Sequence, residues 1–310
     1  MSRDFVWECW DWTSGVEISL CPRYLRCTIR EARRGWLLDL TLQRATFVLF
    51  VTLSAAAVAG TPRILSGKTP TVRSQHRDII IRERHGSQVT SSNWSGYAVT
   101  GAKDSVTDVT GSWVVPSVNC ETTPNAYAAF WVGIDGYSSN TVEQIGTESD
   151  CAGGQATNYA WFEFYPHFSY TIESVTIKPG DEISAQVKYA GGRFTVSITV
   201  NRAASPQFST STKLSQADRS SAEWIVEAPY SGGVLPLADF NTASFGVDNT
   251  GVSNTCDAAI GNATDPIGSF AAADVFAITM TADNGAIKAQ PSTLSTDKSS
   301  FNDMWNSQGP

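Results

Sequence analysis

Acidic and aromatic side chains recur together along three segments that alternate in the manner of β-strands. Residues i, i+2 and i+4 of a strand point to the same side. One face of segment 221–228 therefore carries Glu223 and Glu227, while segments 158–165 and 127–135 bring Tyr159, Trp161 and Glu163, and Trp131 and Asp135, to one face each. Carboxylates among aromatic rings indicate a concave face that grips an extended ligand and offers general acids and bases. An aromatic surface without chemistry, or a protein–protein interface, is the competing interpretation.

Several other catalytic chemistries have no matching residues in the main part of the chain. Its one histidine, His167, follows Tyr165-Pro166, a setting more typical of a structural residue. There is no HExxH motif, GxSxG elbow, P-loop, GxGxxG motif or Cys/His metal spacing. Neither a metal nor another cofactor is implied. Carboxylates, amides and tyrosines are left, and these can activate water against a peptide or a glycosidic bond.

The elements that must position these residues are short strands. From Ser91 onward, alternating runs lie between turn signals, for example at 105–115, 182–190 and 193–200. Lys178-Pro179-Gly180-Asp181 and Ala190-Gly191-Gly192-Arg193 are typical of tight turns. No helical run of ten residues competes with this pattern. We therefore predict one all-β domain over residues 90–310, a sandwich of two packed antiparallel sheets.

Charge is unevenly distributed along the 310 residues, whose net charge is −8. From residue 90 onward, nine Lys and Arg stand against 22 Asp and Glu, a net charge of −13, whereas residues 1–89 carry +5. Nucleic acid is thereby disfavoured as a partner of the main domain, because neutralising phosphates requires basic clusters. Enhanced solubility is an equally good reading of the acidity on its own.

The first 89 residues are interpreted as export and maturation segments. An apolar run over 46–59, preceded by Arg44 and closed by Ala57-Val58-Ala59, is too short to span a bilayer comfortably and predicts a signal peptide at 40–59. Residues 1–39 would then be a non-native extension, the rival being a membrane-anchored form with a cytosolic tail. The basic segment 60–89 is either a flexible linker or a propeptide.

The six cysteines fall into two groups, Cys9, Cys21 and Cys27 in the basic part and Cys120, Cys151 and Cys256 in the main part. An exported domain permits one disulfide among the last three. We expect Cys120 to pair with Cys151 and Cys256 to stay free.

Six motifs occur in an order and at spacings that resemble one known family. They are Ser91-Ser92-Asn93-Trp94-Ser95-Gly96-Tyr97, Trp113-Val114-Val115-Pro116-Ser117, Phe130-Trp131-Val132-Gly133-Ile134-Asp135-Gly136, Glu143-Gln144-Ile145-Gly146-Thr147, Tyr159-Ala160-Trp161-Phe162-Glu163-Phe164-Tyr165-Pro166 and Ala222-Glu223-Trp224-Ile225-Val226-Glu227. Each is moderately specific alone, but the ordered series closely resembles the glutamic peptidases, or eqolisins, from about Ser91 to Val247.

The resemblance implies a concanavalin-like β-sandwich of two sheets with about seven strands each. It places the catalytic pair of the family on Gln144 and Glu227. The groove residues of the family fall on Trp131, Asp135, Trp161 and Glu163, with Glu223 as a neighbour on the same face. This chain departs from the family pattern at Tyr159 and Glu148, where the family usually has aspartate.

Together these inferences predict a secreted, monomeric acid endopeptidase that is insensitive to pepstatin and acts on protein and peptide substrates. It would have no stable membrane insertion after processing. Segment 60–89, at +4, could occupy the acidic groove near neutrality and inhibit the enzyme. Two alternatives stay open: a glycoside hydrolase using Glu223 and Glu227, and a carbohydrate- or peptide-binding module without catalysis. Four residues along a regular strand span about 13 Å, more than the roughly 5–9.5 Å of glycosidase carboxylate pairs.

Overall fold

The computed structural model describes residues 8–10, 17–19 and 76–309, and the chain divides into two compact units, Met1–Val58 and Ala59–Pro310. In the first unit, β1 (Glu8–Trp10) pairs with β2 (Glu17–Ser19) in antiparallel fashion. The signal peptide expected at 40–59, and most of the segments 1–39 and 60–89, lie outside the described residues. Within those residues, no helix has the length and apolarity needed to cross a membrane.

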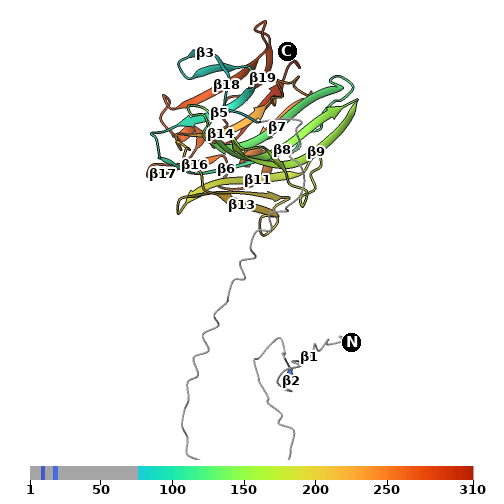
Figure 1. The fold of residues 1–310 in the computed structure, drawn as a ribbon, viewed down its shortest axis with the longest axis vertical. Helices are drawn as coiled ribbons and strands as arrows, with labels where there is room; N and C mark the ends of the chain where they lie inside the picture. Colours follow the sequence, from blue (N-terminus) through green and yellow to red (C-terminus); the bar gives the residue numbers. More distant parts are fainter. Residues whose placement is uncertain (1–7, 11–16, 20–75, 310) are drawn as a thin grey trace, which may run out of the picture. The chain divides into compact units, whose positions relative to one another are not determined.

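The second unit is built almost entirely of strands, as predicted (Figure 1). Its elements are β3 (Ile81–His85), β4 (Gln88–Ser91), β5 (Trp94–Thr100), β6 (Val106–Val114), β7 (Asn125–Ile134), β8 (Val142–Ala152), β9 (Gln155–Tyr165), β10 (Tyr170–Thr171), β11 (Glu182–Ala190), β12 (Arg193–Val200), β13 (Phe208–Thr212), β14 (Ser221–Glu227), β15 (Thr242–Phe245), α1 (Val247–Thr250), β16 (Asp257–Ile260), β17 (Ala263–Pro266), the 3-10 turn η1 (Ile267–Ser269), β18 (Val275–Thr281), β19 (Ile287–Pro291) and β20 (Phe301–Trp305). The predicted turn between β11 and β12 is confirmed, because Gly191 and Gly192 take φ of 58° and 76° between the paired residues Ala190 and Arg193.

The strands form two layers that share hydrogen-bonded edges. One layer runs β4–β18–β5–β14–β7–β8–β9, and the other contains β13–β12–β11–β6 with β15 and β16 paired to β6. All of these pairs are antiparallel except β4–β18, which is parallel. The expectation of about seven strands in each sheet is wrong, because β19 and β20 connect β18 to β15 and join the strands into one network.

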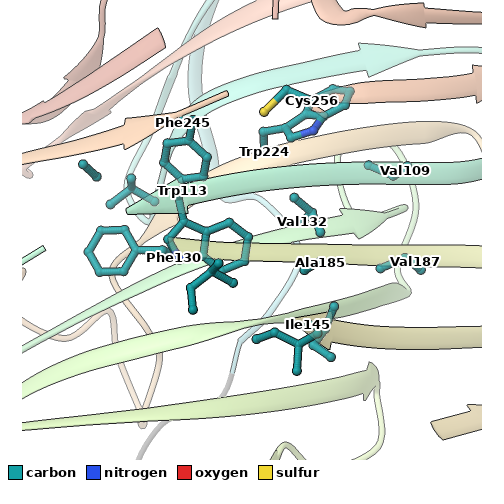
Figure 2. Packing of buried hydrophobic residues seen from close by; sticks show 14 of the residues in the cluster. Val109, Trp113, Phe130, Val132, Ile145, Ala185, Val187, Trp224, Phe245 and Cys256 are labelled. Carbon is teal, nitrogen blue, oxygen red and sulfur yellow. The ribbon is translucent and has the colours of Figure 1, made fainter. Parts of the chain in front are cut away.

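Alternation along the strands sends one set of apolar side chains between the two layers. Phe130 and Val132 on β7, Trp224 on β14 and Val109 and Trp113 on β6 are all fully buried there (Figure 2). Both indole groups also have hydrogen-bond partners: Trp224 Nε1 donates to the Thr110 carbonyl at 2.7 Å and Trp113 Nε1 to Thr147 Oγ1 at 2.9 Å. Both buried indole N–H groups are therefore hydrogen-bonded within the packed core.

Glycine is required at one point where the layers meet. A Cβ at Gly111 on β6 would lie 2.2 Å from Val132 Cγ1 and 3.1 Å from Trp224 Cδ1. The absence of a side chain there lets the tryptophan approach the opposite layer.

The cysteines of the second unit are arranged as the sequence suggested. The structure contains the Cys120–Cys151 disulfide, with a Cα–Cα distance of 5.3 Å. Cys256 is free and buried, and burial raises the pKa of its thiol to about 12. A disulfide of this kind is typical of proteins that fold in an oxidising compartment.

A buried carboxyl group gives the fold a testable pH dependence. Asp303 on β20 is fully buried, Ser95 Oγ donates to its Oδ2 at 2.7 Å, and burial raises its pKa to about 8. A raised pKa in the folded state gives stability that is complete at acid pH and is lost as the pH rises through that value.

We therefore expect the urea concentration at the unfolding midpoint to be lower at pH 8 than at pH 4. This decrease should be smaller for Asp303→Asn, whose amide does not titrate. Urea unfolding at several pH values measures this. If the midpoint of the variant decreased with pH as steeply as that of the wild type, Asp303 would make no contribution to the pH dependence of stability.

Candidate active site

Strand register lines up the predicted groove residues in three transverse rows across β14, β7, β8 and β9. The rows are Glu227–Ala129–Glu148–Tyr159, Ile225–Trp131–Gly146–Trp161 and Glu223–Gly133–Gln144–Glu163. Directly paired residues point to the same face of a sheet. The structure therefore brings Glu227, Glu223, Trp131, Trp161 and Glu163 to one face, as alternation along their strands predicts. Gln144, which only the family resemblance had singled out, lies on the same face.

The two glycines in these rows make room for the Trp131 indole. A Cβ on Gly133 would lie 2.9 Å from Trp131 Cζ3, and a Cβ on Gly146 would lie 2.5 Å from Trp131 Cβ. Trp131 Nε1 donates to Glu227 Oε2 at 2.9 Å. Gly133 on the same strand and Gly146 on the neighbouring β8 thus allow the tryptophan to reach across the face and hold the carboxyl group.

Glu227 is completely buried and has three hydrogen-bonding neighbours. Besides Trp131, the backbone N–H of Arg77 donates to Oε1 at 3.2 Å, and His76 Nδ1 lies 3.2 Å from Oε2. Burial is the largest influence on its pKa and raises it above the ordinary value, although His76, Arg77 and Trp131 act in the opposite direction. Glu227 can therefore hold a proton more readily than an exposed glutamate.

Gln144 is also completely buried, and its carboxamide is held from one side. Its Nε2 donates to Glu163 Oε2 at 3.1 Å, while its Oε1 has no hydrogen-bond partner among the described residues. Burial raises the pKa of Glu163 to about 8. An amide has two N–H donors and an acceptor oxygen, so Gln144 keeps one donor and its oxygen available.

Tyr159 and Glu148, the two residues that depart from the family pattern, lie opposite each other on neighbouring strands and are hydrogen-bonded. Tyr159 pairs with Glu148 in the β8–β9 register. Its hydroxyl donates to Glu148 Oε2 at 2.8 Å and also lies within hydrogen-bonding distance of Asp150 Oδ2, at 3.1 Å. Burial is the largest influence on the pKa of Glu148 and raises it. The hydrogen bond and the charge of His76, together with the hydrogen bond of Tyr159, outweigh burial, so the pKa is lowered overall. Burial, followed by the charge of Glu148, raises the pKa of Asp150 to about 9.

Glu223 lies in the third of these rows, and Asp135 comes directly after the end of β7. The carboxylate of Asp135 accepts the backbone N–H groups of Arg219 and Ser220 at 2.7 and 2.9 Å, so it braces the loop that leads into β14. Burial raises the pKa of both acids, well above its ordinary value for Glu223. Thr141 Oγ1 also donates to Asp135 Oδ2 at 3.4 Å, and none of these bonds reaches the carboxyl of Glu227.

His76 is a site residue that sequence reasoning did not identify. Its imidazole is fully buried and stacks on Trp161, with ring centroids 3.4 Å apart and planes at 11°. Nε2 lies 3.4 Å from Glu148 Oε2, and Nδ1 contacts Glu227 as described above. Burial is the largest influence and lowers the pKa of His76, but the two carboxylates together raise it to about 10, so the ring is an imidazolium between two acids. The only sequence signal was the basic charge of the surrounding segment.

The residues that follow His76 are anchored to the groove through their backbone. Ile79 N–H donates to the Gly136 carbonyl at 3.1 Å, Ile80 N–H donates to Asn93 Oδ1 at 2.8 Å, and Asn93 Nδ2 donates to the Asp78 carbonyl at 3.1 Å. The Ile79 side chain packs in the apolar cluster that contains Trp131 and Trp161. The chain thus lies against the groove face from His76 onward, bends at Asp78 and continues into β3.

Comparisons with known proteins identify the family of the chain. Residues 92–290 match the Peptidase A4 family. The chain is 29% identical over 200 residues to Aspergillopepsin-2 of Aspergillus niger, covering 57% of this chain and 70% of that protein. It is 30% identical over 175 residues to Scytalidopepsin B of Scytalidium lignicola, covering 54% and 64% respectively.

Solved structures show the same fold. The crystal structure of scytalido-glutamic peptidase with a transition state analog inhibitor matches with a TM-score of 0.56 and 22% identity, covering 69% of this chain and 98% of that one. The structure of SCP-B, a member of the Eqolisin family, in complex with the tripeptide Ala-Ile-His matches with a TM-score of 0.52 and 21% identity over the same shares of the two chains.

Proposed function

Because the chain belongs to the Peptidase A4 family and is a glutamic endopeptidase, we propose that Glu227 and Gln144 are the pair with which it hydrolyses peptide bonds. The observation that carries this proposal is the state of the two side chains. Glu227 is a fully buried acid with a raised pKa, and Gln144 is a fully buried amide with an unbonded oxygen on the same groove face. Buried polar groups with unused hydrogen-bonding capacity are expected to receive a partner, here water and substrate.

In the proposed reaction, ionised Glu227 removes a proton from a water held against the Gln144 oxygen and directs it at the scissile carbonyl. The Gln144 N–H that Glu163 does not use then stabilises the oxyanion as a neutral donor. Protonated Glu227 gives its proton to the leaving nitrogen. Trp131 keeps the carboxyl in place throughout, because its indole N–H bonds to Oε2.

An acid optimum follows from these groups. Glu227 must cycle between its two protonation states, which works best near its own pKa. Glu163 and Asp150 are already neutral at neutral pH and stay so on acidification, since burial raises their pKa values to about 8 and about 9. These two groups therefore add no negative charge around the developing oxyanion.

We also propose that segment 60–89 inhibits the enzyme near neutrality. Its described part supports this, because His76 sits between Glu227 and Glu148 where water and substrate would have to enter. The ion pairs hold while the carboxylates are ionised and the imidazole is charged. Protonation of the carboxylates at acid pH removes this attraction and releases His76, whereas β3 and β4 stay paired in the sheet.

Export supplies the compartment in which such a switch is useful. The Cys120–Cys151 disulfide supports secretion. A signal peptide at 40–59 would direct it.

The regular geometry of β14, which bears both Glu223 and Glu227, does not favour the glycosidase alternative. Glu223 and Glu227 pair without a register shift to both β5 and β7, so no bulge shortens the distance between them. At about 3.3 Å per residue their Cα atoms lie roughly 13 Å apart, whereas glycosidase carboxylates lie roughly 5–9.5 Å apart.

Hydrolysis of denatured casein by the acid-treated chain at pH 3–4 tests the function. We expect cleavage that pepstatin does not reduce, because the groove chemistry uses a glutamate and an amide. Release of sugar from a polysaccharide without proteolysis would select the glycosidase, and binding without turnover would select the non-catalytic module.

A further inference from the structure

We propose that the peptide bond between His76 and Arg77 is the bond that the enzyme cuts to release its own inhibitory segment. This inference rests on the proposed function, because it uses Glu227 as the acid–base. Two independent features of the described residues lead to it. One is the backbone atom that faces Glu227, and the other is that His76 blocks the site whereas the residues after it are anchored to the domain.

The first feature is the position of the leaving nitrogen. Hydrolysis of a peptide bond requires a proton donor next to the nitrogen that departs. The backbone nitrogen of Arg77 lies 3.2 Å from Glu227 Oε1. That nitrogen belongs to the His76–Arg77 peptide bond, so the bond already lies against the catalytic acid.

The second feature is that the chain changes its role at this bond. On one side, His76 blocks the site through its contacts with Glu227, Glu148 and Trp161. On the other side, Ile79 and Ile80 are anchored by hydrogen bonds to Gly136 and Asn93. A cut between the two parts frees the blocking residue and leaves the anchored residues on the domain.

The chemistry is consistent with the blocked state. The imidazole occupies a place 3.2 Å from Glu227 Oε2, which is hydrogen-bonding distance and the place that an attacking water needs. Acidification protonates Glu148 and Glu227, the imidazolium leaves, and water takes its place beside the His76 carbonyl. Glu227 then returns its proton to solvent, so that it meets this water in its ionised form. Water oxygen bonds to the carbonyl carbon, the carbon–nitrogen bond breaks, and Glu227 passes the proton from water to the nitrogen. The products are a carboxyl group on His76 and an amino group on Arg77.

The side chain of Arg77 helps to hold the His76–Arg77 peptide bond next to Glu227. Its guanidinium lies over the Tyr230 ring, 4.8 Å from the centroid. A cation over an aromatic face is attracted to it. Tyr230 follows β14 closely, so this contact keeps Arg77 next to the strand that bears Glu227.

The test is acidification of the full 310-residue chain, followed over time by intact mass and N-terminal sequencing. We expect a product that begins at Arg77. Arg77→Lys keeps the N–H and the charge and should give the same cut, whereas Arg77→Pro removes the N–H that faces Glu227 and should slow this cut at least tenfold. A first product beginning elsewhere, or an Arg77→Pro chain cut there at the unchanged rate, would overturn the assignment.

Casein hydrolysis in the same samples separates this inference from the function. Acid-induced casein hydrolysis with a different N-terminus would refute the His76–Arg77 bond and leave the peptidase intact. Absence of both casein hydrolysis and processing would refute the proposed function and this inference with it.

Discussion

Glu227→Gln is expected to abolish casein hydrolysis, with a loss in kcat of at least about 10³-fold. Glutamine has nearly the shape of glutamate and can still accept a hydrogen bond from Trp131, which in the wild type spans 2.9 Å. It cannot take a proton from water or return one to the leaving nitrogen. The loss should therefore appear in turnover and leave the fold intact, as circular dichroism and thermal unfolding would show.

Glu223→Gln is the matched control for this change. Glu223 is also fully buried, lies on the same strand and faces the same side, four residues before Glu227. We expect its substitution to reduce activity far less. Appreciable residual turnover in Glu227→Gln, or an equal loss in Glu223→Gln, would contradict the assignment of the acid–base to Glu227.

The second large effect concerns the inhibitory segment. The processed enzyme keeps its own residues 77–89, with β3 and β4 in the sheet. A synthetic peptide of residues 60–89 should therefore inhibit it at mildly acidic pH through the part that ends at His76, and His76→Ala in that peptide should weaken inhibition at least tenfold. The physical reason is that the imidazolium makes two ion pairs and a ring stack in a fully buried position. Inhibition constants at low and high salt measure the effect.

His85→Ala provides the control within the same peptide. The side chain of His85 is 79% exposed and its ion pair is with Glu83 of its own strand, so its removal should leave inhibition nearly unchanged. The pH dependence has a defined sign. The pKa of Glu148 is lowered by His76, so its contribution is present near neutrality and is lost as the pH falls through that lowered value. Absence of inhibition at low salt, or equal effects of the two histidines, would refute the proposed role of His76.

Much of the fold was predictable because strand alternation is a strong local signal. The segments 158–165, 182–190, 193–200 and 221–228 form strands close to their expected bounds. The apolar side chains that alternate along them are mostly buried, and Phe162 is half-buried. The distribution of strands was not predictable, since pairings such as β15–β20 and the parallel β4–β18 join residues far apart in sequence. Strand number per sheet depends on such long-range contacts.

The groove-facing residues could be assigned from alternation and family resemblance together. Trp131, Trp161 and Glu163 face the groove with Glu227 and Gln144 because their strands pair in register. Asp135 shows the limit of the method: it follows the last residue of β7 with φ of 73°, and its carboxylate binds the Arg219–Ser220 backbone. Strand alternation does not extend through such a turn.

His76 could not be found from the sequence because nothing in its spacing distinguishes it. The basic charge of residues 60–89 indicated an electrostatic partner for the acidic domain, but not which residue enters the groove. That choice depends on the stack with Trp161 and the separation of Glu148 and Glu227, both of which exist only in the folded chain. The pairing of Tyr159 with Glu148 was hidden for the same reason.

The most direct measurement is a high-resolution crystal structure of the acid-activated enzyme after the segment has left. We predict one ordered water within about 3 Å of both a Glu227 carboxyl oxygen and the Gln144 carboxamide. A groove in which these two groups stand too far apart to share a single water, with no closure that brings them together, would contradict the account.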